Sequence, residues 1–195
     1  MRLFVAVEIA PAVAAGAAAL IEELRRRAER LAPHARITWM SEERLHVTVR
    51  FIGNVDEAKA EAIQAALQPS IDVAPFDLLV AGAGAFPRTG APRVLWSGVA
   101  DGAASLTAVE RDITERLNQV GVAPEPRDYR PHLTLARIRD PGGLKSPSLC
   151  HGLQDQMVGI THVEAITLFE SRLSPKGPTY VPVGRTPVRA GLKTL

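Results

Sequence analysis

The sequence predicts an α+β fold with mostly antiparallel sheets, arranged as two similar lobes with outer helices. Helical and strand-like segments interleave without the regular alternation of a doubly wound sheet, and several strand-like segments alternate apolar and polar residues. One short motif also occurs once in each half of the chain. We therefore expect residues 1–195 to form a single bilobal domain, with two sheets related by a pseudo-twofold axis and one motif per lobe.

Three helices are predicted by apolar residues that recur at three- and four-residue steps. The first spans 11–31 and starts with a proline, which the first turn of a helix tolerates. The second follows Asp56, a favourable N-cap residue, and stops before Pro69. The third spans 106–120, and Gly121 is placed to end it.

Strand-like segments lie before, between and after these helices. Their expected ranges are 2–9, 45–52, 76–82, 93–99, 132–138, 162–170 and 179–184. Stretches rich in turn-forming residues separate several of them. The last ten residues are expected to form a loose tail.

The composition is that of a globular protein, with 46% hydrophobic and 23% charged residues. A net charge of +2 is too small to indicate a protein that coats nucleic acid, although it is compatible with a modest basic groove. No apolar run approaches the roughly 20 residues of a membrane span, and the start reads as a strand, not as a signal peptide. Cys150 is the only cysteine, so neither an internal disulfide nor a cysteine zinc site is available. We expect a monomeric, cytoplasmic protein that does not bind membranes.

The repeated motif is a histidine followed two residues later by a threonine, with aliphatic residues in between. It occurs as His46-Val47-Thr48-Val49 and as His132-Leu133-Thr134-Leu135. In a strand, residues i and i+2 point to the same side, so each histidine shares a face with its threonine, and Arg50 shares the face of His46. One such pair is usually only a polar strand face, but a solvated face gives no reason for histidine to recur in the same register. The repeat therefore favours a functional site.

Two histidines suit general acid–base chemistry at a phosphorus centre. Their ordinary pKa near ~6.5 allows one to accept a proton from the attacking oxygen while the other protonates the leaving oxygen. The hydroxyls of Thr48 and Thr134 could donate to phosphate oxygens, and arginine could add charge stabilisation. This scheme needs no metal and no cofactor, and the motifs contain no carboxylate to hold a metal.

With these motifs the chain resembles the two-histidine (2H) phosphoesterases. Within that superfamily it resembles the bacterial RNA 2′,3′-cyclic phosphodiesterases, also known as the 2′–5′ RNA ligase family. The likeness covers nearly the whole chain. Beyond the motifs it rests on Arg2-Leu3-Phe4-Val5-Ala6-Val7, Trp39, Phe86-Pro87, Leu95-Trp96, Arg130-Pro131, Ser171-Arg172-Leu173, Gly177 and Tyr180.

The resemblance implies two lobes around a central cleft and hydrolysis of RNA 2′,3′-cyclic phosphate ends to 2′-phosphates, with reversible 2′–5′ ligation in some members. It implies that His46 is the proton donor and His132 the proton acceptor, whereas the motifs alone permit either assignment. Thr48 and Thr134 would hold the phosphate. Arg137 would be a further anion-binding group, but strict alternation puts it on the face opposite His132, so a bulge, a strand end or a long reach is required. Arg50 fits the active face better by parity.

The same motifs are compatible with two other functions. One is a phosphodiesterase for a small cyclic nucleotide such as ADP-ribose 1″,2″-cyclic phosphate. The other is an RNA-end-binding protein without turnover. The chain has no Gly-x-Ser-x-Gly elbow and no P-loop motif, which argues against an α/β-hydrolase and against ATP binding by that loop.

The remaining histidines and aromatic residues have weaker patterns. His34, His151 and His162 have no neighbours at metal-ligand spacing. Trp39, Phe86 and Trp96 could stack on a nucleobase, although packing in the core or at its rim is the commoner role of such residues. Arg130 is assigned no role beyond contact with RNA.

Overall fold

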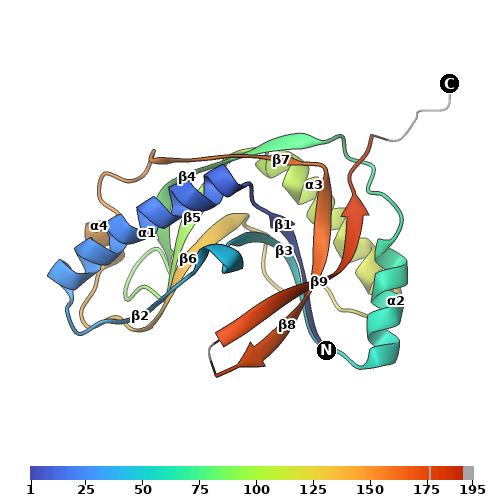
Figure 1. Ribbon diagram of the computed structural model, residues 1–195, viewed down its shortest axis with the longest axis horizontal. Helices are drawn as coiled ribbons and strands as arrows, with labels where there is room; N and C mark the ends of the chain where they lie inside the picture. The colour runs from blue at the N-terminus through green and yellow to red at the C-terminus, as the bar shows by residue number, and fades with distance from the viewer. Residues whose placement is uncertain (176, 191–195) are drawn as a thin grey trace.

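The strands of the protein form one curved antiparallel sheet with helices packed against it, as the computed structural model in Figure 1 shows. The structure describes residues 1–175 and 177–190. In chain order the elements are β1 (Arg2–Glu8), α1 (Pro11–Leu31), β2 (Arg36–Trp39), the 3₁₀ helix η1 (Glu42–Arg44), β3 (His46–Asn54), α2 (Glu57–Leu67), β4 (Phe76–Phe86), β5 (Val94–Asp101), α3 (Ala103–Gln119), β6 (His132–Asp140), α4 (Ser146–Leu149), β7 (Met157–Val163), β8 (Ala165–Ser174) and β9 (Gly177–Pro187).

The strand order within the described residues is β7-β4-β5-β6-β3-β1-β8-β9, and β2 also pairs with β6. Each half of this order contains one motif strand, β6 or β3. The halves meet where Val47 of β3 lies opposite Leu133 of β6. The predicted α+β class with mostly antiparallel strands is confirmed, and the two expected sheets are the two halves of one sheet.

Helices α1 and α3 each pack on the half of the sheet that does not contain the preceding strand. Helix α1 follows β1 but packs on β7 at the far end of the other half, while α3 follows β5 but packs against β3 and α2 (Figure 1). The contact of α1 with β7 is close, because a side chain at Gly16 would lie 2.1 Å from the Val158 carbonyl oxygen. One continuous hydrophobic core joins residues of both halves.

The helix predictions are confirmed by the details of the helix ends. The Asp56 carboxylate accepts a hydrogen bond from the Lys59 backbone N–H at 2.8 Å, as an N-cap should. Gly121 follows α3 with a φ of 75°, a conformation that favours glycine. None of the described helices is long and apolar enough to cross a bilayer.

Three expectations about the strands and the C-terminus were incomplete or wrong. The segment 162–170 is not one strand, since β7 ends at Val163 and β8 begins at Ala165. The short strand β2 and helix α4 were not anticipated. The expected tail is packed over its first residues: the buried Thr186 hydroxyl donates to the Leu67 carbonyl, and Val188 forms a bridge with Ile71. Residues 191–195 of that tail lie outside the described residues.

Candidate active site

The two motif strands are neighbours in the centre of the sheet. They run antiparallel through the Val47–Leu133 bridge, so His46 lies on the same side of this bridge as Thr134, and His132 on the same side as Thr48. The aliphatic residues of both motifs are buried, whereas the histidines and threonines are half-buried. The face assignment made for these four polar residues is therefore confirmed.

Both histidine rings are oriented by the same backbone contact. Nδ1 of His46 lies 2.8 Å from the Arg44 carbonyl oxygen, and Nδ1 of His132 lies 2.7 Å from the Arg130 carbonyl oxygen. A carbonyl can only accept a hydrogen bond, so each Nδ1 carries the proton and donates. This leaves Nε2 of each neutral ring with a lone pair that can take a proton from a ligand.

Each histidine also packs against aromatic rings from its own half of the sheet. The His46 ring centroid lies 5.0 Å from that of Phe4 and 5.1 Å from that of Tyr180, which it meets edge-on. The His132 centroid lies 5.3 Å from that of Phe86, also edge-on. These rings remove water from the imidazoles.

The surroundings lower the pKa of both histidines. Burial lowers the pKa of His46 to about 4, against the opposing effect of its hydrogen bond to the Arg44 carbonyl, and the positive charges of Arg137 and His132 lower it further. Burial is also the main cause that lowers the pKa of His132, again opposed by its backbone hydrogen bond and assisted by Arg137. Both rings are therefore neutral in the unliganded protein at neutral pH.

Arg137 acts on the two histidines because β6 contains a bulge. Thr134 pairs with Trp96 and Ala136 pairs with Leu95, so Leu135 has no partner on β5. The extra residue reverses the alternation, which makes Leu135 and Ala136 both buried and returns Arg137 to the exposed side. Of the three arrangements that could reconcile Arg137 with its motif, the structure has the bulge.

The expectation that Arg50 shares the face of His46 is wrong, and a matching bulge in β3 is the reason. Thr48 pairs with Ala6 and Arg50 with Val5, which leaves Val49 without a partner on β1. Arg50 is therefore turned to the buried side and is only 2% exposed. It contributes to the wall of the cavity described below, but its guanidinium is bound to the Ala123 carbonyl and to Glu125.

A cavity of about 790 Å³ opens beside the motifs. Its wall includes Thr48 and His132, together with residues to which no role was given from sequence. Among these are Phe51, Arg93, Arg127 and Tyr129, together with the acidic Glu110, Glu125 and Asp128. Phe51 stands five residues after His46, as Arg137 does after His132, and it is 51% exposed. The bulges that create these positions leave no clear mark in the apolar pattern, which is why Phe51 was missed.

The three aromatic candidates occupy different places. Phe86 lies at the cavity, against His132, and is in contact with Trp96 at a centroid distance of 5.1 Å. Trp96 covers Gly84, where an added Cβ would come within 2.3 Å of the indole ring. Trp39 packs instead under the Arg25 guanidinium.

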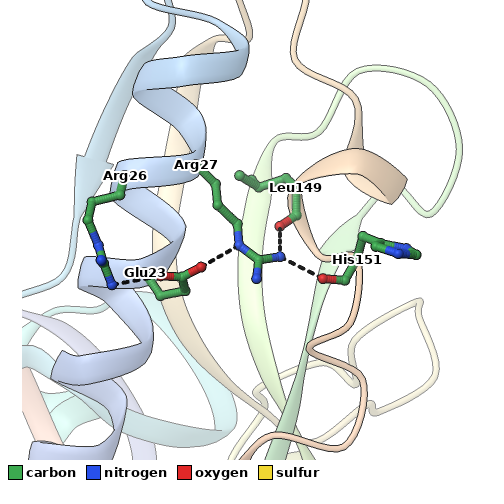
Figure 2. A network of polar contacts seen from close by, with 5 residues as sticks. All are labelled: Glu23, Arg26, Arg27, Leu149 and His151. Atoms are coloured by element: carbon green, nitrogen blue, oxygen red, sulfur yellow. Dashed lines mark hydrogen bonds and ion pairs between the residues drawn. The ribbon is translucent and has the colours of Figure 1, made fainter.

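The remaining histidines lie in other surroundings. His162 is exposed and contacts Asp77 at 2.7 Å. The backbone carbonyls of His151 and Leu149 accept hydrogen bonds from Arg27, whose guanidinium also binds Glu23, so that α1 is tied to the end of α4 (Figure 2). Within residues 1–175 and 177–190, no three histidine, cysteine or acidic residues are grouped so as to hold a metal ion.

Comparisons with known proteins agree with this architecture. A model of the 2′-5′ RNA ligase superfamily matches residues 11–171. An RNA 2′,3′-cyclic phosphodiesterase of Aeropyrum pernix is 39% identical over 72% of this chain and 80% of its own length. One of Archaeoglobus fulgidus is 31% identical over 92% of this chain and 96% of its own length.

Among solved structures, TT0787 of Thermus thermophilus has the same fold, with a TM-score of 0.75, 24% identity and coverage of 97% of this chain and 98% of the other. Escherichia coli LigT in its apo form gives a TM-score of 0.67 at 23% identity, covering 96% and 97%. The chain belongs to the 2′-5′ RNA ligase superfamily.

Proposed function

We propose that this protein hydrolyses RNA 2′,3′-cyclic phosphate ends to 2′-phosphates, with His46 and His132 as the acid–base couple. The proposal rests mainly on the identical hydrogen bonding of the two histidine rings. In each ring Nδ1 is bound to a backbone carbonyl, so that Nε2 can interact with a ligand. Relatives that are 30–39% identical and are named RNA 2′,3′-cyclic phosphodiesterase support the choice of substrate.

The reaction requires one proton to be taken up and one to be delivered. His132 Nε2 accepts a proton from water as the water oxygen attacks phosphorus, and the bond from phosphorus to O3′ breaks. His46, protonated at Nε2, delivers its proton to O3′, which leaves a 3′-hydroxyl and a 2′-phosphate. Each positioned acid or base contributes ~10²–10⁴-fold to the rate.

Because the pKa of His46 is low, Nε2 of this ring takes up a proton only when a bound anion raises that pKa. A cyclic phosphate carries one negative charge, and a negative charge beside an imidazole raises its pKa. The assignment of His46 as donor comes from the family resemblance. In the unliganded protein the surroundings lower the pKa of both rings, so neither carries a second proton at neutral pH. Substrate binding between the rings would therefore decide which of them is protonated.

The charge that develops on the phosphate would be stabilised from the same face. The hydroxyls of Thr48 and Thr134, which lie on the half-buried face of the histidines, would donate to its non-bridging oxygens, and Arg137, whose charge acts on both histidines, would add electrostatic stabilisation. Arg50 takes no part in this step, because its guanidinium is bound elsewhere.

Three arginines in the wall of the cavity, which also contains the acidic Glu110, Glu125 and Asp128, support an RNA end over a small cyclic nucleotide as the substrate. Arg93, Arg127 and Arg130 line the cavity, and basic side chains at such positions can contact phosphates beyond the terminal one. We also propose that the protein acts as a monomer in the cytoplasm, which rests on the sequence alone.

The test is incubation with an oligonucleotide that ends in a 2′,3′-cyclic phosphate, with and without EDTA, followed by analysis of the terminus. A 2′-phosphate product in both reactions is expected. A 3′-phosphate product, or loss of the activity in EDTA, would contradict the proposed chemistry. Binding without turnover would indicate an RNA-end-binding protein, and turnover of ADP-ribose 1″,2″-cyclic phosphate alone would indicate a small-nucleotide enzyme. Incubation of the product with an RNA bearing a 5′-hydroxyl tests whether the 2′–5′ ligation implied by the family also occurs.

A further inference from the structure

One wall of the cavity is a segment without helix or strand between α3 and β6, which we call the wall segment (residues 122–131). It carries Arg127 and Arg130 at the cavity, and the Arg130 carbonyl holds Nδ1 of His132. The position of this segment therefore affects both the rim of the cavity and one of the two histidines.

The middle of the wall segment is attached to β3 by side chains. The Tyr129 hydroxyl donates to the Thr48 carbonyl at 3.0 Å, and the Phe51 N–H donates to the Glu125 carboxylate at 3.2 Å. These two backbone groups become available because β3 and β6 pair at Val47 and Leu133 and then separate. Side chains of the wall segment thus satisfy polar groups on a strand edge that no neighbouring strand covers.

Arg50 provides a third attachment, from the buried side of β3. One amino group of its guanidinium donates to the Ala123 carbonyl, and the other lies 3.4 Å from the Glu125 carboxylate. The planar fork of arginine can engage a carbonyl and a carboxylate together, which the single ammonium of lysine cannot do in the same geometry. Glu125 in turn binds the Phe51 N–H, so one carboxylate connects Arg50 to the strand edge.

Burial makes this attachment costly to break. Arg50 is 2% exposed, and removing the partner of a buried charge leaves that charge uncompensated. By contrast, Arg36 and Asp140 form a pair at the same N–O distance, 3.4 Å, with side chains that are 77% and 45% exposed. A pair of that kind contributes little to stability, so it provides a matched control.

We infer that Arg50 is a positioning residue for substrate binding: it holds the wall segment through Ala123 and Glu125 and does not contact the reacting phosphate. The inference rests on the proposed function only in taking an RNA end as the ligand.

The test compares Arg50→Met, Glu125→Gln and the control Arg36→Met with the wild-type protein on the cyclic-phosphate oligonucleotide. For Arg50→Met we expect KM to rise about tenfold and kcat to change less than about threefold, because binding groups move while the reacting groups remain. Glu125→Gln should raise KM about threefold. The variant with both Arg50→Met and Glu125→Gln should have the same KM as Arg50→Met alone, since both substitutions break the same Arg50–Glu125 interaction. Arg36→Met should leave KM unchanged. Amide hydrogen exchange at Phe51 and across the wall segment should be faster in Arg50→Met than in the wild type, and unchanged in Arg36→Met.

An unchanged KM in Arg50→Met, with only a lower Tm, would overturn the inference and leave Arg50 a purely structural residue. A fall in kcat at constant KM would also overturn it, because Arg50 would then act at the reacting phosphate. If Arg50→Met does not fold, the KM of Glu125→Gln tests the inference instead, since the Glu125 side chain is 44% exposed and its substitution should be tolerated. An unchanged KM in Glu125→Gln would then overturn the inference. If the wild-type protein shows no turnover, the proposed function fails by itself. The inference is then tested by the Kd of an oligonucleotide with a 2′-phosphate end, which should rise about tenfold in Arg50→Met.

Discussion

The separate aromatic surroundings of the two histidines allow their pKa values to be changed one at a time. His46 contacts Phe4 and the half-buried Tyr180, while His132 contacts Phe86 in the other half of the sheet. Since burial is the main cause of the low pKa in both cases, Tyr180→Ala should expose His46 to water, and Phe86→Ala should expose His132.

The size of the effect follows from the shift at His46. A decrease of the pKa from 6.5 to about 4 corresponds to about 3 kcal/mol against charging the ring. Tyr180 is one of the two rings in contact, so its removal should restore roughly one pKa unit, or about 1.4 kcal/mol. The His132 pKa should move by less than about 0.3 units in this variant, because Tyr180 lies in the other half of the sheet, against His46.

Titration of the histidine ring resonances by NMR measures both values in one experiment, since the chain has only five histidines. Tyr180→Ala should raise the pKa of His46 and leave that of His132, and Phe86→Ala should do the reverse. If His46 is the acid, the alkaline limb of the kcat/KM profile should also move to higher pH in Tyr180→Ala. Equal shifts of both histidines in either variant, or no shift at all, would refute local burial as the cause.

Three further predictions concern stability and the phosphate site. Because the pKa of His46 is lower in the folded than in the unfolded chain, the unfolded chain binds more protons between about pH 6.5 and 4. From about pH 7 to about pH 5 the free energy of unfolding should therefore fall by about 2 kcal/mol more in the wild type than in His46→Gln. Urea titrations at both pH values measure this difference, and equal losses in the two proteins would contradict it. Thr48→Val and Thr134→Val should each reduce kcat/KM about 10–100-fold through a lost hydrogen bond to a charged group, with near-wild-type values as the contrary result. Arg137→Met should reduce kcat/KM about 100-fold and raise the pKa of both histidines, since its charge lowers both; an NMR titration that shows only one of them shifted would count against a shared site.

The polar face of each motif could be predicted from sequence because it depends only on the two-residue period of a strand. His46 and Thr48, like His132 and Thr134, stand before any irregularity in their strands, so simple alternation places them correctly. The helices were also predictable, since their caps and apolar steps are local features of the chain.

The arginines could not be placed in this way, because each lies beyond a bulge. The bulges at Val49 and Leu135 reverse the alternation, which turns Arg50 inward and Arg137 outward. A bulge depends on pairing with a neighbouring strand, here β1 or β5, and that pairing is not visible in the motif itself. The resemblance implies a role for Arg137, while parity alone favours Arg50, whose side chain the structure buries.

The packing of the C-terminal segment depends on contacts distant in sequence. The hydroxyl of Thr186 binds the end of α2, and Val188 bridges to Ile71, more than a hundred residues earlier. Nothing local in the last residues indicates these partners. Nothing local in the wall segment indicates its attachment to β3 either, and that attachment decides what the segment contributes to the cavity.

The central claim is that His46 and His132 act as one acid–base couple on a cyclic phosphate. Single-turnover rates of His46→Ala, His132→Ala and the double variant on the cyclic-phosphate oligonucleotide test it most directly, with circular dichroism to show that each variant is folded. We expect each single variant to lose at least ~10²-fold, and the double variant to lose far less than the product of the two, because the residues act as a unit. A folded single variant that retains more than about a tenth of the wild-type rate would contradict the claim.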